Sequence, residues 1–306
     1  MGSTMSTSTV STLTGPLAAL KVNPHPLNLT YEHLELLISR DDPSVTIVAL
    51  NRPRKRNAMN SQLWKEIGRV FSSLGTTGDA CRVVLLVGNG SCFSAGIDIT
   101  DPAFLPAPKD NAAHTGLAFL PKLAEMQACF TALEHCPVPV VAAIHGSCIG
   151  AGIDLITAAD IRLCDATANF GVREVALGLA ADVGTLQRLP KVVGNASLAR
   201  ELCLTGQDFS SAIALEMGLV SRIAKLNVIQ EALQVCAKIA QHGPVAVRGT
   251  KQALVYARDH SVQAGLEQVG AYNALALQSD DLVAAWTART TKKKPVFGEL
   301  PAYSRL

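Results

Sequence analysis

Short apolar runs alternate with segments of helical spacing over the first part of this chain, and the alternation limits the folds open to it. Each run is rich in β-branched residues and is bounded by turn-forming residues, which is typical of strands. A strand that is apolar at every position is buried on both faces, as in a parallel sheet covered by helices. The pattern therefore predicts an α/β core. Its strands are expected at residues 45–50, 83–87, 138–144 and 161–164.

From about Ser197 onward the periodic segments favour helices only. The expected helices are 207–217, 228–241, 245–257 and 260–276. The opening residues, in contrast, are rich in Ser and Thr and show no such period. We therefore expect four parts: a disordered tail over 1–29, an α/β core over 30–196, a helical region over 197–290 and a second tail over 291–306.

Composition excludes several classes of function. Hydrophobic residues make up 48% of the 306 residues, so the chain can bury a sizeable core. The formal net charge of +2 is too small to indicate a nucleic-acid-binding surface. No stretch reaches the roughly 18 apolar residues that a membrane span needs. The eight cysteines form no C-x-x-C pair, so we expect reduced thiols and no metal site.

Three carboxylates in apolar surroundings are the main chemical signal. Asp154 lies within the apolar segment 150–156, and Glu174 and Asp182 bracket the apolar segment 175–181. An ionised carboxylate in such surroundings is costly unless it is paired or hydrogen-bonded. Burial raises its pKa toward the range in which it can move protons at neutral pH.

Two glycine-bearing loops, residues 94–98 and 146–152, precede these acids. Glycine allows backbone N–H groups to turn toward a ligand. Acids combined with such donors form a site that can stabilise an enolate oxyanion.

Five stretches together resemble the crotonase (enoyl-CoA hydratase/isomerase) superfamily over about residues 30–290. Four are similar to the superfamily as a whole, and the fifth, which contains Asp182, is similar to its Δ3,5-Δ2,4-dienoyl-CoA isomerases. The stretches are residues 51–60, 93–98, 136–140, 146–154 and 172–190.

The resemblance implies a spiral of ββα units with C-terminal helices that build a homotrimer or homohexamer. It implies an acyl-CoA substrate, of which coenzyme A is a part, and no separate cofactor. The thioester carbonyl would be held by the backbone N–H groups of Ile97 and Ala151. The residues around these donors, which would also contact substrate, are Ala95, Gly96, Asp98 and Gly150. Three arginines would suit CoA phosphates or would simply be solvated: Arg52, Arg54 and Arg56.

The resemblance also assigns roles to the acids. Hydratase sites carry Glu at both main positions, where this chain has Asp154 and Glu174. Asp182 is the additional carboxylate of the dienoyl-CoA isomerase pattern. Glu174 would remove a proton from C2 and Asp182 would deliver one at C6, while Asp154 would tune the pair. The implied reaction is the conversion of 3,5-dienoyl-CoA to 2,4-dienoyl-CoA in unsaturated fatty acid β-oxidation; the alternative is an enoyl-CoA hydratase or another crotonase-type enzyme.

Each acid also has a structural alternative. Asp154 could bond a nearby backbone group, Glu174 could be a surface strand residue, and Asp182 could be the N-cap of a helix over 183–189. Asp98 is expected to structure its loop more than to take part in chemistry.

The chain ends with Ser304, Arg305 and Leu306, which is the Ser-Lys-Leu peroxisomal address with Arg in place of Lys. We expect this tripeptide to bind a peroxisomal import receptor, with the mitochondrion as the alternative location. Residues 1–6 fit a loose myristoylation pattern, but a disordered tail is the simpler interpretation.

Overall fold

The computed structural model describes residues 13–27, 29–76 and 80–300. The strands of this part form two sheets. The main sheet runs, in spatial order, β1 (Val22–Pro24), β2 (Leu34–Ser39), β3 (Val45–Leu50), β4 (Val83–Gly88), β5 (Val140–Ile144), β7 (Ile161–Cys164) and β10 (Arg222–Ile223). From β3 to β10 all neighbours are parallel, whereas β1 and β2 add to the edge in antiparallel fashion. The smaller sheet joins β6 (Ser147–Ile149), β8 (Asn169–Gly171) and β9 (Asp208–Ser210).

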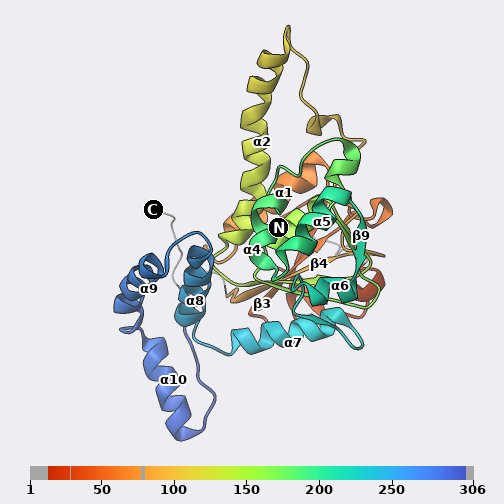
Figure 1. Cartoon of the computed structure of the whole chain (residues 1–306). Coiled ribbons are helices and arrows are strands. Elements are labelled where there is room, and N and C mark those ends of the chain that lie inside the picture. Colours follow the sequence, from red (N-terminus) through yellow and green to blue (C-terminus); the bar gives the residue numbers. More distant parts are fainter. Residues whose placement is uncertain (1–12, 28, 77–79, 301–306) are drawn as a thin grey trace, which may run out of the picture.

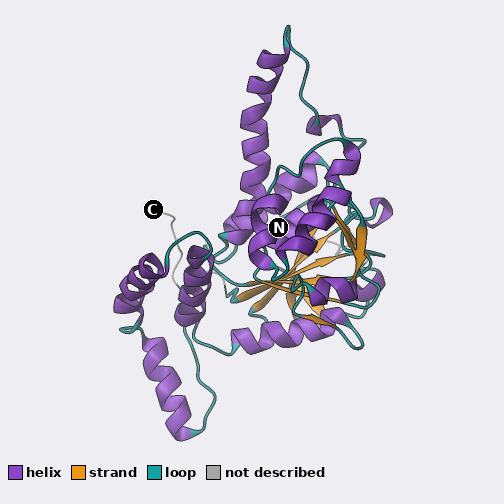
Figure 2. Ribbon diagram, in the orientation of Figure 1, coloured by secondary structure: helices purple, strands orange, loops and turns teal. Residues whose placement is uncertain are grey.

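Helices cover both faces of the main sheet (Figure 2). Every residue of β3, β4 and β5 is buried, as the continuous apolar runs predict. Alternate residues enter different apolar clusters: Val84 and Leu86 pack on the side of α1 (Ser61–Ser73) and α3 (Ala151–Ala158), while Val83 and Leu85 pack on the side of α7 (Val228–Ala240). The predicted α/β core is confirmed, and its strands lie where the sequence places them.

The long helix α2 (Ala112–Glu134) packs against α1 through its C-terminal half and projects from the body at its N-terminal end (Figure 1). Among the residues that the structure describes, no helix has both the length and the apolarity to cross a bilayer.

The prediction that only helices follow Ser197 is wrong at two places. Between α5 (Ala196–Thr205), α6 (Ser211–Glu216) and α7 lie the short strands β9 and β10, which pair with β8 and β7. The predicted helix 207–217 consequently begins at Ser211, where the Ser210 side chain caps it. Strands of three and two residues are too short to show a period, and their neighbours in the sheet define them.

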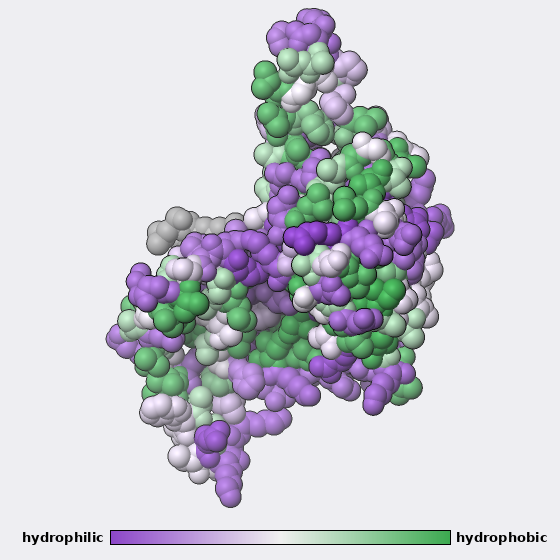
Figure 3. All heavy atoms as spheres, viewed as in Figure 1, coloured by the Kyte–Doolittle hydropathy of each residue, from purple (hydrophilic) through white to green (hydrophobic). Residues whose placement is uncertain are grey.

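The last helices stand beside the main body (Figure 1). They are α8 (Pro244–Ala257), α9 (Val262–Ala276) and α10 (Asp280–Thr291). Neither α9 nor α10 buries a residue within the described chain. Apolar residues are visible on this part of the surface as well as on the main body (Figure 3).

The predicted disordered tail over 1–29 is wrong for the residues that the structure describes. Leu17 is fully buried in the apolar cluster on the α7 side, and β1 pairs with β2. His25 is also buried and contacts Thr46. The Ser- and Thr-rich composition of this segment gave no sign that Leu17 joins the core or that β1 adds to the edge of the main sheet. Residues 1–12 lie outside the described residues.

Candidate active site

The two glycine-bearing loops leave the carboxyl ends of neighbouring strands, β4 and β5, where open α/β sheets commonly bind ligands. Backbone hydrogen bonds join the loops along their length. Ser94 N donates to Ser147 O at 2.9 Å, and Ile149 N donates to Ser94 O at 3.1 Å. The structure therefore brings together the loops that the sequence singled out.

The N–H group of Ile97 is presented by its own peptide geometry. Met59 N donates to Gly96 O at 2.7 Å. Since the C=O and N–H of a trans peptide point in opposite directions, the Ile97 N–H on the same peptide points away from Met59. Within the described chain it donates to no protein acceptor. Gly96 has a φ of +91°, and a Cβ there would lie 2.8 Å from Ile149 O, so the close approach requires glycine.

Ala151 is the first residue of α3, so its N–H group lies at the N-terminus of this helix. Gly150 precedes it with a φ of +50°, and Ala151 itself does not have a positive φ. The first N–H groups of a helix have no intrahelical acceptor and lie at the positive end of the helix dipole. A Cβ built on Gly96 would lie 3.7 Å from Ala151 N, so the Ala151 donor lies beside the loop that presents Ile97.

Asp154 lies fully buried in the first turn of α3. Its Oδ1 accepts a 2.5 Å hydrogen bond from the backbone N–H of Thr185, and its Oδ2 has no partner in the described chain. Burial raises the pKa of Asp154 to about 7; the charge of Glu174 adds to the rise, and hydrogen bonds from Thr185 oppose it. Asp154 therefore does bond a backbone group, as its structural alternative allows, but the partner is distant in the sequence. The carboxyl group can also change its protonation near neutral pH.

Glu174 begins the 3₁₀ helix η4 (Glu174–Leu177), which follows β8 after a short connection, so its interpretation as a surface strand residue is wrong. Its Oε2 is buried without a partner in the described chain. Burial raises its pKa, and the charge of Asp182 adds to the rise. A Cβ on Gly150 would lie 3.3 Å from Glu174 Oε1, so the carboxylate lies beside the residue that presents the Ala151 donor.

Asp182 lies on the loop between η4 and α4 (Thr185–Val192). The residue is exposed overall, but partial burial of its carboxyl group raises its pKa. Gly184 is the N-cap of α4, so the alternative role of Asp182 as that cap is wrong. Gln127 of α2 donates a 2.6 Å hydrogen bond to the Asp182 backbone carbonyl. The apolar segment between the two acids does not shield them in the single chain, because Leu177 remains 56% exposed.

The three arginines do not share one environment. Both terminal nitrogens of Arg52 donate to Asp98 Oδ2 at 3.1 Å, and one also donates to the Ala58 carbonyl. The guanidinium of Arg52 is therefore bonded within the protein and is not exposed for a ligand as those of Arg54 and Arg56 are. Arg54 is exposed, and Arg56 is exposed and donates to Ser147 Oγ at 2.7 Å. Asp98 also accepts hydrogen bonds from Thr100, as expected of a residue that structures its loop.

Sequence reasoning missed the residues that connect these groups. Thr185 bonds Asp154, and Gln127 bonds the loop of Asp182, but neither lies near its partner in the sequence. Asn57 was also missed: buried at a φ of +53°, it donates to the carbonyls of Asn89 and Cys92. Asn57 lies within the stretch 51–60 that carries the family resemblance, and Asn is a residue that tolerates a positive φ, so the sequence could have indicated a tight turn at this position.

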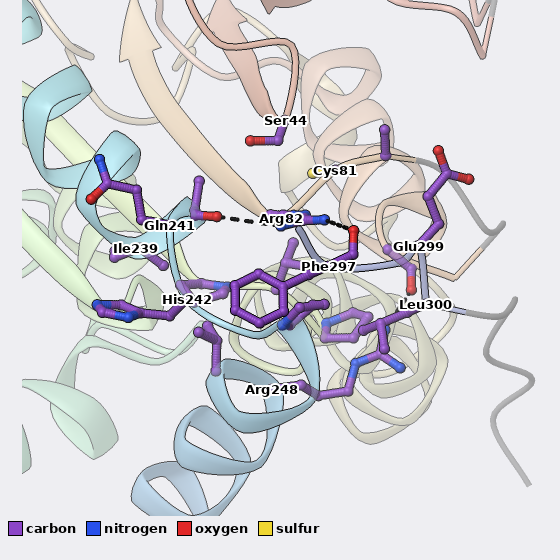
Figure 4. A pocket seen from close by; sticks show the side chains of 18 of the residues that line it. Ser44, Cys81, Arg82, Ile239, Gln241, His242, Arg248, Phe297, Glu299 and Leu300 are labelled. Atoms are coloured by element: carbon purple, nitrogen blue, oxygen red, sulfur yellow. Dashed lines mark hydrogen bonds between the residues drawn. The ribbon is translucent and has the colours of Figure 1, made fainter. Parts of the chain in front are cut away.

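Two cavities are relevant to the location of the site. One, of about 370 Å³, is lined by Asp182, Gln127 and Arg188 among others. Another, of about 450 Å³, is lined by Ser44, Arg82 and Phe297 (Figure 4). The second lies where β3 and β4 begin, and the acids and donors lie beyond the ends of β4 and β5, so it is not part of the candidate site. No group of side chains in the described ranges is arranged to hold a metal ion.

Comparison with known proteins agrees with this arrangement. The family model for enoyl-CoA hydratase/isomerase matches residues 40–301, and a Bacillus anthracis enoyl-CoA hydratase structure is similar with a TM-score of 0.77 and 28% identity, covering 87% of this chain and 99% of that one. The chain therefore belongs to the enoyl-CoA hydratase/isomerase, or crotonase, family.

Within this family the chain is similar to Δ3,5-Δ2,4-dienoyl-CoA isomerases. It is 45% identical to the human mitochondrial enzyme of that name over 87% of this chain and 81% of the relative. It is 40% identical to the peroxisomal enzyme of Arabidopsis thaliana over 89% of this chain and 99% of the relative.

Proposed function

We propose that this chain converts 3,5-dienoyl-CoA to 2,4-dienoyl-CoA. The observation that carries the proposal is the pair Glu174 and Asp182. Both carboxyl groups have a pKa raised by burial, they interact electrostatically, and Glu174 lies beside Gly150 at the start of α3. The names of the relatives agree with this activity.

The reaction begins with the thioester carbonyl bound by the N–H groups of Ile97 and Ala151. Ionised Glu174 removes a proton from C2, and the resulting charge spreads through the dienolate onto the carbonyl oxygen, where the two donors stabilise it. Double bonds form at C2–C3 and C4–C5 as protonated Asp182 delivers a proton to C6. The two acids thus exchange protonation states in each turnover, and raised pKa values suit both to this task near neutral pH.

The remaining candidate residues support binding. Ala95, Gly96 and Gly150 give the backbone shape that exposes the two donors, and Arg54 and Arg56 are available on the surface for CoA phosphates. Asp154 would tune the pair: the charge of Glu174 raises the pKa of Asp154, so the two groups are electrostatically coupled, and its bond to Thr185 fixes the start of α4.

The chain also has the surface expected of a homotrimer or homohexamer. Large apolar side chains on α8, α9 and α10 are exposed, among them Leu254 at 67%, Val262 at 82% and Trp286 at 68%. Exposed apolar patches of this kind mark interaction sites. Light scattering at micromolar concentration should show an oligomer, and a stable monomer would contradict this part of the proposal.

We assign the enzyme to the peroxisome, with the mitochondrion as the alternative. The Arabidopsis thaliana relative is named as peroxisomal and the human relative as mitochondrial. The tripeptide Ser304, Arg305 and Leu306 lies outside the described residues. Deletion of Leu306 should leave activity intact and shift the protein to the cytosol, and unchanged import would contradict the assignment.

The direct test of function is an ultraviolet assay. Incubation with a 3,5-dienoyl-CoA should produce the absorbance of the conjugated 2,4-dienoyl-CoA, whereas water addition to a 2-enoyl-CoA should be much slower. Hydration without isomerisation would replace the proposal with the hydratase alternative, since the family includes both activities.

A further inference from the structure

The loop that presents Ile97 is held from one side by the chain segment 52–59. Arg56 O accepts from Ala95 N at 2.9 Å, Asn57 O accepts from Ser94 Oγ at 2.9 Å, and Met59 bonds the residues on either side of Ile97. The position of the Ile97 N–H group therefore depends on the position of this segment.

An ion pair connects the segment 52–59 to the loop that presents Ile97. The guanidinium of Arg52 contacts Asp98, the residue that directly follows Ile97, with both terminal nitrogens at 3.1 Å from Oδ2. One of these nitrogens also donates to the Ala58 carbonyl. The pair is largely shielded from solvent, with 12% of the Arg52 side chain and 10% of the Asp98 side chain exposed.

We infer that Arg52 and Asp98 are positioning residues for the oxyanion-binding N–H group of Ile97. This inference rests on the proposed function. Arg52 connects the segment that bonds Gly96 to the residue that follows Ile97, so it restrains the donor from both sides. The fixed planar fork of an arginine suits this task better than the flexible amine of a lysine.

The Asp98 carboxylate keeps its negative charge at neutral pH. A hydrogen bond from the Thr100 hydroxyl, together with Arg52, holds the pKa of Asp98 below its usual range. Thr100 N and Oγ1 both donate to Asp98 Oδ1, at 3.2 and 2.6 Å, which leaves Oδ2 for Arg52. Each oxygen of Asp98 therefore has a defined partner.

The competing role for Arg52 is a contact with the CoA phosphates, and the two roles predict different losses. A misplaced oxyanion donor lowers kcat, because the donor acts most strongly on the charge that develops in the transition state. A lost phosphate contact raises KM and weakens the binding of free CoA, while kcat is largely kept.

The experiment compares Arg52→Met, Arg52→Lys and Asp98→Asn with the wild type. Arg40→Met is the matched control, since Arg40 is exposed and bonds Val22 and Asn23 near the sheet edge. Three quantities are measured: kcat, the affinity for free CoA, and the ultraviolet band of bound 2,4-dienoyl-CoA. That band moves to longer wavelength when the thioester carbonyl is polarised, and it reports on the donors without turnover.

Arg52→Met should lower kcat ~10-fold or more, somewhat less than the ~10²–10³-fold loss of a whole oxyanion donor. It should also reduce the spectral shift and leave CoA affinity unchanged. Arg52→Lys should restore part of both losses. Asp98→Asn should reproduce the effect, and the double variant should lose little more than either single one, because both act through one contact. Arg40→Met should behave as wild type.

Weakened CoA binding with a normal kcat and a normal spectral shift would overturn the inference in favour of a phosphate contact. Independent, additive losses in the double variant would also overturn it. If Arg52→Met does not fold, Arg52→Lys and Asp98→Asn carry the same test. Because the spectral shift requires only bound product, a wild type that shifts the band but does not isomerise would refute the proposed function and not this inference.

Discussion

Asp154→Asn should remove a pH dependence of stability that one buried carboxyl group creates. The Asp154 carboxyl has a pKa of about 7 in the folded chain against 3.8 for the ordinary residue, and burial is the main cause. Its protonated form is therefore the one that the fold favours. The stability that this form contributes is fully present below pH 3.8 and is lost as the pH rises through 7.

The size of the effect follows from the same values. Each unit of pKa difference corresponds to about 1.4 kcal/mol. From pH 5 to about pH 7, the Asp154 carboxyl group is protonated in the folded state but ionised in the unfolded state. Over these roughly two pH units the free energy of unfolding of the wild type should fall by about 2 to 3 kcal/mol, and above pH 7 it should change little further. Asparagine keeps an oxygen that can accept from Thr185 N–H and cannot ionise, so the variant should lack this loss.

The assay is urea denaturation of wild type and Asp154→Asn at both pH values and at one protein concentration. The difference in the free energy of unfolding between the two proteins should move in favour of the variant by about 2 to 3 kcal/mol from pH 5 to pH 8.5. A difference that does not change with pH would refute the reasoning, because it would mean that Asp154 does not titrate in this range.

Four further substitutions test the proposed chemistry. Asp182→Asn should lower kcat by ~10² or more while CoA affinity is kept, and Glu174→Gln should be at least as damaging; near-normal isomerisation by Asp182→Asn would remove it from the mechanism. Ala151→Pro should lower the rate ~10²–10³-fold with little loss of stability, since Ala151 is the first residue of α3, where proline is tolerated; a retained rate would show that its N–H is not a donor. Gly150→Ala should lower both activity and stability, because alanine is strained at a φ of +50° and the new methyl group would lie 3.3 Å from Glu174 Oε1; unchanged activity would show that the position of this carboxylate does not depend on Gly150.

The sequence predicted those parts of the fold that depend on local pattern. The β3, β4 and β5 runs were visible because continuous burial demands continuous apolarity. The glycine loops and the acids were visible for the same reason: a glycine or a carboxylate is conspicuous in an apolar stretch.

What the sequence missed depends on contacts between distant segments. The strands β9 and β10 exist because β8 and β7 offer them an edge. Arg52 looked like one of three surface arginines until the fold placed Asp98 against it. The bond from Thr185 to Asp154 spans 31 positions, so no local spacing could reveal it.

The uneven burial of this chain has a consequence for hydrogen exchange. Amides in β3, β4 and β5 lie beneath helices on both faces, so they should exchange only when the whole core unfolds. Amides in α9 and α10, which bury no residue within the described chain, should exchange by local opening. An exchange experiment would therefore test the proposed oligomer: strong protection of α9 and α10 would indicate that another subunit covers them, and fast exchange would count against it.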